Sequence, residues 1–201
     1  MLISVRRRLV FLSLPKTATT SVEAALAPHC GVVVRNPPSL KHATYNAFMR
    51  DYAPILERKC RLKRSDYEVL CILREPMAWL HSWYRYRTRE GVPIPERRTD
   101  KVTFSEFLEA YLAKPKPPFV RNIVDPFEFV TAKDGSVGVD RIFKYEDMEA
   151  FRRFASEMLQ ADIEFPVKNV SPGAPRYDVP EELLARVRER LAPAIRLWES
   201  L

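Results

Sequence analysis

The chain has 201 residues, and its 33 Lys or Arg against 26 Asp or Glu give a formal net charge of +7. This length fits one globular domain, and a composition that is 46% hydrophobic excludes an intrinsically disordered chain. The positive charge favours anionic ligands such as nucleotides, acidic glycans, nucleic acid or an acidic membrane surface. A basic surface that serves only solubility would have the same composition.

The chain has three cysteines, Cys30, Cys60 and Cys71, and no two of them have CxxC spacing. This pattern indicates neither a disulfide framework nor a thiolate zinc site. The apolar run after Arg6, Arg7 and Arg8 is too short for a signal peptide, and no stretch is long enough to span a bilayer. We therefore expect a soluble, cytoplasmic protein without an integral membrane segment.

The first strong element is the β-prone run 9–14, which predicts a buried strand that ends at Pro15. A polar segment then leads into residues 21–26, which have the composition of a helix. Thr20 followed by Glu23 matches a capping box, which predicts that this helix begins at the end of the polar segment. The order is strand, loop, helix.

Strand and helix patterns alternate through the rest of the chain. They predict a β-run at 32–34, a helix over 45–56, a strand over 67–73, a helix over 76–88, a strand over 141–144, a helix over 146–159, and a C-terminal helix after Pro180 that is interrupted or kinked at Pro193. This alternation predicts an α/β fold built on a central parallel sheet, within a single domain over residues 1–201. Residues 91–101 and 114–122, rich in proline and basic residues, are expected to be surface loops.

The loop between the first strand and its helix has a composition suited to anion binding. It consists of Pro15, Lys16, Thr17, Ala18, Thr19, Thr20 and Ser21. A turn of this kind presents free backbone N–H groups at the positive end of a helix dipole, and the lysine adds a full charge. The turn has none of the glycines of a Walker A loop, so it suits phosphate or sulfate but not the usual nucleoside triphosphate cradle. A strand-to-helix turn with an incidental lysine is the alternative.

A second pair of residues could hold another phosphate. Arg74 follows the strand predicted to be central, and Ser82 lies eight residues later on the helix that starts at Pro76. A guanidinium and a hydroxyl held by rigid elements can grip one phosphate together. Most of the aromatic residues near Ser82 are expected to pack this helix against the sheet rather than to stack on a base.

Together these motifs resemble the family of sulfotransferases that use 3′-phosphoadenosine 5′-phosphosulfate (PAPS), and its bacterial carbohydrate-type members in particular. The loop 15–21 is similar to the family's 5′-phosphosulfate loop, and Arg74 with Ser82 is similar to its 3′-phosphate pair. Residues 143–148 resemble the family's late strand-to-helix entry, and residues 169–171 resemble its cofactor-covering loop. The resemblance therefore spans most of the chain.

The resemblance implies a three-layer fold like that of P-loop nucleotide kinases. It also implies sulfuryl transfer from PAPS to a hydroxyl or amine of a glycan or glycolipid, with 3′,5′-adenosine bisphosphate as product and no metal. Lys16 would stabilise the leaving group, and His42 resembles a family histidine and is the predicted general base. A surface histidine without a chemical role is the alternative, and Glu23 is the second candidate base. Ala18 replaces a glycine common in the family, and it would be strained if its φ were positive.

Two other functions fit part of the pattern. A small nucleotide or sugar kinase shares the anion-binding loop, but it needs Mg²⁺ and usually an acidic residue after a central strand, where this chain has Arg74. A noncatalytic nucleotide- or nucleic-acid-binding module would use the positive charge alone. The sequence contains no RNA- or DNA-binding motif, so we expect a small-molecule donor and no nucleic acid partner.

Overall fold

The computed structural model describes residues 1–92, 94–166 and 177–201. The contacts divide the chain into two compact units. The first consists of Met1–Arg74, Pro126–Val170 and Leu201, and the second of Glu75–Asp125 and Ser171–Ser200. Each unit has its own elements and its own core, and the expectation of a single domain stays a prediction.

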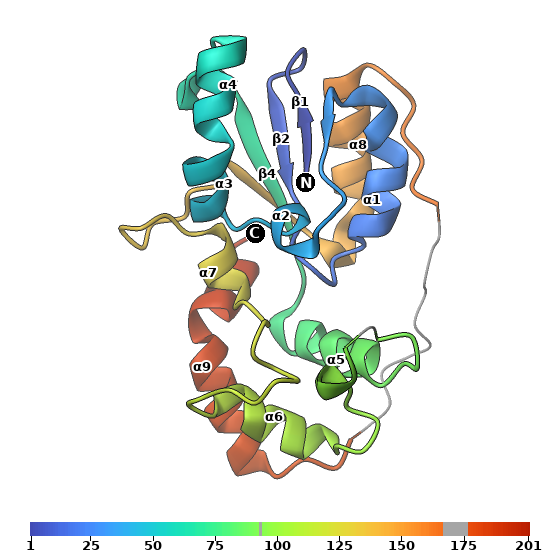
Figure 1. Ribbon diagram of the computed structural model, residues 1–201, viewed down its shortest axis with the longest axis vertical. Helices are drawn as coiled ribbons and strands as arrows, with labels where there is room; N and C mark the ends of the chain where they lie inside the picture. Colours follow the sequence, from blue (N-terminus) through green and yellow to red (C-terminus); the bar gives the residue numbers. More distant parts are fainter. Residues whose placement is uncertain (93, 167–176) are drawn as a thin grey trace. The chain divides into compact units, whose positions relative to one another are not determined.

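The first unit is built on a five-stranded sheet with the order β3-β1-β2-β4-β5 (Figure 1). The strands are β1 Leu2–Ser4, β2 Leu9–Leu12, β3 Val32–Val33, β4 Glu68–Leu73 and β5 Arg141–Lys144. β2, β4 and β5 run parallel, which confirms the predicted parallel core of the sheet. The sheet as a whole is mixed, because the unpredicted strand β1 pairs antiparallel with both β2 and β3.

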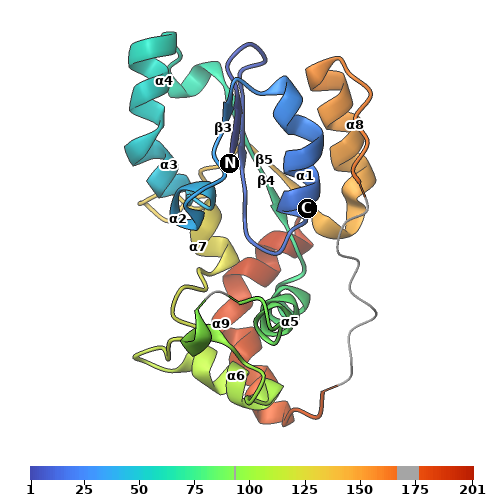
Figure 2. The ribbon, with the colours of Figure 1, turned by 45° about the vertical axis from the view of Figure 1, so that its right-hand side comes forward.

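Helices cover both faces of this sheet. Those of the first unit are α1 Thr19–Leu26, α2 Pro38–Lys41, α3 Tyr45–Asp51, α4 Ala53–Cys60, α7 Pro126–Val130 and α8 Met148–Leu159. Figures 1 and 2 show α1 and α8 on one face, and α3 and α4 on the other. The unit therefore has the α/β structure that the alternating pattern predicts and the three layers that the resemblance implies.

The core of the first unit explains why its central strand reads as a continuous apolar run. Every residue of β4 from Val69 to Leu73 is at most 1% exposed, as expected for a parallel strand covered on both faces. Leu70 and Ile72 pack in one cluster with Phe11 of β2 and Phe151 of α8. Complete burial of one such side chain contributes about 1.5–3 kcal/mol. This packing fixes the strand ends, where the candidate site lies.

The single helix predicted over residues 45–56 is wrong, because the structure has two helices there. α3 ends at Asp51 and α4 begins at Ala53, with Pro54 in the first turn of α4. A proline has no N–H to donate and its ring clashes with the preceding turn, so Pro54 disfavours one continuous helix from α3 onward. In a first turn the missing N–H has no partner to lose, so Pro54 starts a helix there.

The second unit is helical. Its α-helices are α5 Pro76–Arg87, α6 Phe104–Leu112 and α9 Glu181–Glu199. Both α5 and α6 pack on α9, around a cluster that includes Trp79, Phe107 and Leu191. The predicted helix over 76–88 is confirmed, and the carboxylate of Glu75 caps it by accepting hydrogen bonds from two backbone N–H groups at 3.0 and 2.6 Å. α9 is not interrupted at Pro193, which lies inside the helix.

Candidate functional site

The candidate site lies in the first unit, at the edge of the sheet where the parallel strands end. Leu12 pairs with Cys71, and Leu73 pairs with Lys144. The residues that follow β2, β4 and β5 therefore leave the sheet at the same edge, which is where ligands bind in open α/β sheets. Three segments lie at this edge: the loop with Lys16 after β2, Arg74 after β4 and Tyr145 after β5.

The loop between β2 and α1 has an unusual backbone. φ is +74° at Lys16 and +54° at Ala18, whereas Thr17 between them has no positive φ. Such alternation of backbone handedness directs successive N–H groups into a concavity that binds anions. No described residue accepts a hydrogen bond from the N–H groups of Thr17, Ala18, Thr19 or Thr20. The loop and the first turn of α1 therefore offer four donors at the positive end of this helix.

The capping box predicted for Thr20 and Glu23 is wrong. α1 begins at Thr19 with Ala18 as its N-cap, and no side chain caps it. The left-handed turn at Ala18 starts the helix earlier than the pattern suggests, so that the Ala18 carbonyl already accepts a hydrogen bond from the Ser21 N–H at 2.9 Å. Thr20 is then inside the first turn and exposed, where its hydroxyl cannot act as an N-cap.

The hydroxyl groups of the loop contribute unequally. Thr17 is completely buried, and its Oγ1 donates a hydrogen bond to the Leu14 carbonyl at 2.8 Å. This bond stabilises the turn. It also means that the hydroxyl proton of Thr17 is not available to a ligand. Thr19 and Ser21 are also buried, at 8% and 6% exposure. Within this loop the backbone N–H groups and the lysine are therefore the better donors for a ligand.

His42 lies against the start of the same loop. It follows α2, and its Nδ1 is 2.6 Å from the carbonyl oxygen of Ser13. Because a carbonyl can only accept, Nδ1 holds the proton, and Nε2 of the neutral ring is left as an acceptor. Burial lowers the pKa of His42 below its ordinary value, although the bond to Ser13 opposes this shift. A neutral imidazole whose Nε2 has no hydrogen-bond partner among the described residues has the form that a general base needs.

Glu23 is engaged elsewhere and is the poorer base. Its carboxylate pairs with Nε of Arg35 at 2.7 Å and with Nζ of Lys41 at 2.8 Å. Burial alone would raise the pKa of Glu23, but the hydrogen bonds from Lys41 and Arg35 outweigh it and leave the pKa below its usual value. Arg35 precedes α2 and Lys41 is its last residue, so Glu23 holds the segment that leads to His42 against α1.

Arg74 carries an unsatisfied donor. Its guanidinium carbon lies 4.6 Å from the centre of the Tyr145 ring, a cation–π distance. Its Nε is buried and has no hydrogen-bond partner among the described residues. A buried donor without an acceptor is unfavourable by about 1–3 kcal/mol, and an oxygen of an anionic ligand would remove that penalty. The sequence reasoning missed Tyr145, whose signal was its place directly after the strand that pairs with β4.

Two predicted contacts have no test in this structure. Ser82 is half-buried on α5 in the second unit, and its hydroxyl has no hydrogen bond to a described residue. Arg74 belongs to the first unit, so the pairing of these two side chains stays a prediction. Residues 169–171 lie outside the described residues. His81, which directly precedes Ser82, packs against Phe104, with 4.3 Å between the centroids of the two rings.

Among the described residues, no three His, Cys, Asp or Glu side chains are grouped as the ligands of one metal ion would be. In the same part of the chain, no helix combines the length and the apolar character needed to cross a bilayer.

Comparisons with known proteins give one structural likeness. No family model matches the chain. No curated protein matches it by sequence. Among solved structures, the chain is similar to a sulfotransferase from Alicyclobacillus acidocaldarius, with a TM-score of 0.49 and 12% identity, over 96% of this chain and 94% of the other. At this identity the likeness extends to no particular side chain.

Proposed function

We propose that the chain transfers a sulfuryl group from PAPS to a hydroxyl or amine acceptor, with a glycan or glycolipid as the acceptor class. The observation that carries the proposal is the loop before α1. Lys16 and Ala18 are left-handed there, and four backbone N–H groups next to a lysine lack partners in the described chain. This geometry suits the oxygens of a phosphosulfate without the glycines of a triphosphate loop.

The unsatisfied Nε of Arg74 supports a second anionic contact with the donor. The guanidinium stacks on Tyr145, which fixes its plane while leaving its donors available. A phosphate can accept two hydrogen bonds from such a group. In this proposal Arg74 binds the 3′-phosphate of the donor, and Ser82 adds a hydroxyl to the same phosphate.

The proposed chemistry divides between Lys16 and His42. Bound PAPS supplies an activated sulfuryl group. The acceptor oxygen or nitrogen forms a bond to sulfur while the bond from sulfur to the bridging phosphate oxygen breaks. Negative charge grows on that oxygen, where Lys16 and the loop N–H groups stabilise it. Nε2 of His42 takes the proton from the acceptor.

The donor class can be tested by thermal shift. At about 100 times its dissociation constant, a ligand that binds only the folded state adds roughly 2.7 kcal/mol of stability. We expect 3′,5′-adenosine bisphosphate to give such a shift without Mg²⁺, and ATP to give much less. An equal shift with ATP, or a strict Mg²⁺ requirement, would indicate a kinase instead. Binding of the bisphosphate without turnover of radiolabelled PAPS on any acceptor would indicate a noncatalytic module.

The role of Lys16 can be separated from donor binding. Lys16→Ala should lower kcat strongly at saturating PAPS, because the ammonium acts on charge that develops only in the transition state. Its affinity for the bisphosphate should fall much less than kcat. Lys133→Ala, which removes the same charge from an exposed site of the first unit, is the control and should leave kcat unchanged. Normal turnover by Lys16→Ala would show that the loop has another role.

A further inference from the structure

Positive charge is concentrated in two short segments of the first unit. Residues 6–8 and 57–68 together carry eight Lys or Arg against three Asp or Glu, a surplus of five out of the net +7 of the chain. The donor site uses none of these residues. Most of the excess charge of the protein therefore has no place in the proposed reaction.

The fold brings the two segments to one end of the sheet. Arg8 directly precedes β2, and its carbonyl accepts a hydrogen bond from the N–H of Glu68, the first residue of β4, at 2.9 Å. Figures 1 and 2 show the β1–β2 turn and the end of α4 that leads to β4 at the same end of the first unit. This end is opposite to the strand ends that carry Lys16 and Arg74. We call residues 6–8 and 57–68 the basic edge.

Many cations of the basic edge have no acidic partner. Six exposed residues form no ion pair with a described residue: Arg6, Arg8, Arg58, Lys59, Arg61 and Lys63. Two of the three acids in these segments are engaged. The Asp66 carboxylate accepts a hydrogen bond from the Lys63 backbone N–H at 2.8 Å, and Glu68 lies 3.6 Å from Arg141. Glu57 is the remaining acid, and the surplus of five cations gives the edge a net positive charge.

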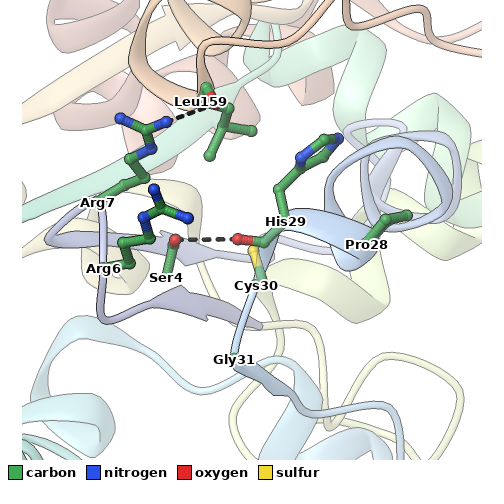
Figure 3. A pocket seen from close by; sticks show the side chains of 8 residues that line it. All are labelled: Ser4, Arg6, Arg7, Pro28, His29, Cys30, Gly31 and Leu159. Atoms are coloured by element: carbon green, nitrogen blue, oxygen red, sulfur yellow. Dashed lines mark hydrogen bonds between the residues drawn. The ribbon is translucent and has the colours of Figure 1, made fainter.

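The basic edge also includes part of a pocket. The pocket has a volume of about 360 Å³, and Arg6, Arg7, His29 and Gly31 are among its lining residues (Figure 3). The Arg7 guanidinium is fixed by hydrogen bonds to the Leu159 carbonyl at 3.2 Å and to the Gln160 side chain at 2.8 Å. No Asp or Glu lines the pocket. Its size and charge suit one anionic group of a small or chain-like ligand.

We propose that the basic edge binds a polyanionic polysaccharide, with one sulfate or carboxylate group in the pocket and further groups on the cations at the end of α4. A ligand with charges spaced along a chain can engage cations that are spread over two segments. This inference does not depend on the proposed sulfuryl transfer, because it concerns the opposite end of the sheet and other residues.

The surface of the first unit favours this ligand over single-stranded nucleic acid or a membrane. Proteins bind single strands by stacking bases on aromatic side chains, and proteins at a bilayer interface use Trp and Tyr as anchors. No described Trp, Tyr or Phe of the first unit is exposed. A polysaccharide with sulfate or carboxylate groups needs cations and a pocket, and the edge supplies both.

Heparin, a sulfated polysaccharide, is the probe, and its affinity is measured by calorimetry at low salt. We expect Arg6→Glu/Lys59→Glu to lose at least about tenfold in affinity, because each reversal removes a contact and adds repulsion. The matched control Lys101→Glu/Lys133→Glu makes the same change in net charge at two other exposed lysines and should lose less than about twofold. Both variants should keep the thermal midpoint of the parent, since all four side chains are exposed.

Several results would overturn the proposal. An equal loss of affinity in the control would show that heparin binding depends only on the net charge of the protein. Displacement of heparin by saturating 3′,5′-adenosine bisphosphate would place it at the Lys16 loop instead. Tighter binding of duplex DNA or of vesicles of anionic phospholipid, lost in the same variant, would assign the edge to another class of partner. We expect the bisphosphate affinity to be unchanged in Arg6→Glu/Lys59→Glu, which would show that the loss of heparin binding does not arise at the donor site.

Discussion

Ala18, like Lys16, has a left-handed backbone that is unfavourable for a residue with a Cβ. An L-residue with a Cβ is destabilised by about 1–2 kcal/mol in the left-handed region, where glycine is not. Its φ of +54° therefore meets the condition under which alanine at this position is strained. Because this φ belongs to the turn that exposes the N–H groups, the loop keeps its geometry at a cost in stability.

Replacing Ala18 by glycine should stabilise the protein. We expect Ala18→Gly to raise the free energy of unfolding by about 0.5–1 kcal/mol, since relief of strain exceeds the extra freedom that glycine gives the unfolded chain. Ala24→Gly, at an exposed position inside α1, is the control and should lower it by about 1 kcal/mol. Urea unfolding of both variants measures the difference. A loss in Ala18→Gly as large as in the control would contradict the left-handed assignment.

The lowered pKa of His42 predicts the pH below which the proposed reaction should slow down. Burial favours the neutral ring, so we expect kcat/KM to fall only below pH 6.5, the ordinary value for histidine. His42→Ala should lose about 10²–10⁴-fold in turnover and keep its affinity for the bisphosphate. The exposed His29, changed to alanine, should leave turnover unchanged. A fully active His42→Ala enzyme would remove His42 from the mechanism.

The same shift has a consequence for stability. Because the folded state binds the His42 proton less well than the unfolded chain, this group contributes stability that is present above pH 6.5 and is lost as pH falls. His42→Ala should remove that part of the pH dependence. Its unfolding midpoint near neutral pH should change little, because a half-buried loop residue supports little core packing.

At the scale of elements, the ion pairs of Glu23 tie α2 to α1. Glu23 and Lys41 are only 15% and 18% exposed, so their bond at 2.8 Å is better shielded than a surface pair. Lys41 directly precedes His42. Glu23 is thus a positioning residue for the base in the proposed mechanism, although it touches no reacting atom.

Neutralising Glu23 should therefore affect His42 first. We expect Glu23→Gln to lower kcat by about threefold to tenfold, with the bisphosphate affinity unchanged, because only the position of the base is loosened. The pKa of His42, followed by NMR titration, should fall further, since the carboxylate charge now raises it. Arg35→Gln, which removes the 61% exposed partner, should have a smaller effect. An unchanged His42 titration in Glu23→Gln would refute the coupling.

Sequence patterns predicted the elements whose local signal agrees with their packing. The runs at 67–73 and 141–144 were found because β4 is buried on both faces and β5 leads directly into the turn before α8. β1, with three residues, and α2, with four, are too short to show the periodic spacing of apolar residues that marks a strand or a helix. The capping box failed for another reason: a positive φ at Ala18 is not visible in a pattern of residue types.

The candidate site was predictable only where it depends on chain order. Lys16 and Arg74 follow directly from the rule that ligands meet the carboxyl ends of parallel strands. Their neighbours come from distant parts of the chain: Tyr145 stacks on Arg74, and the Ser13 carbonyl orients His42. Such contacts depend on tertiary packing, so no spacing within one segment could have shown them.

At the scale of the whole molecule, the proposed donor contacts are distributed over two compact units. Lys16 and Arg74 belong to the first unit, and Ser82 belongs to the second. The sequence spacing predicts that Arg74 and Ser82 hold one phosphate, which is a statement about energetic coupling between two residues. Such coupling can be measured without any knowledge of how the units are arranged.

A double-mutant cycle on bisphosphate affinity tests this prediction. Arg74→Ala should weaken binding by about 2–5 kcal/mol, because it leaves a buried phosphate without its charged partner. Ser82→Ala should weaken it by about 0.5–1.5 kcal/mol, the usual contribution of one hydrogen bond. If both side chains hold the same phosphate, the effect of the double variant should depart from the sum of the two single effects by about 0.5–3 kcal/mol.

The control is Ser105→Ala in the second unit. The hydroxyl of Ser105 donates a hydrogen bond to the Asp178 carbonyl at 3.2 Å, so its loss should show no coupling to Arg74. Additivity of Arg74→Ala and Ser82→Ala within about 0.5 kcal/mol would mean that the two residues bind different parts of the ligand, or that one does not bind it.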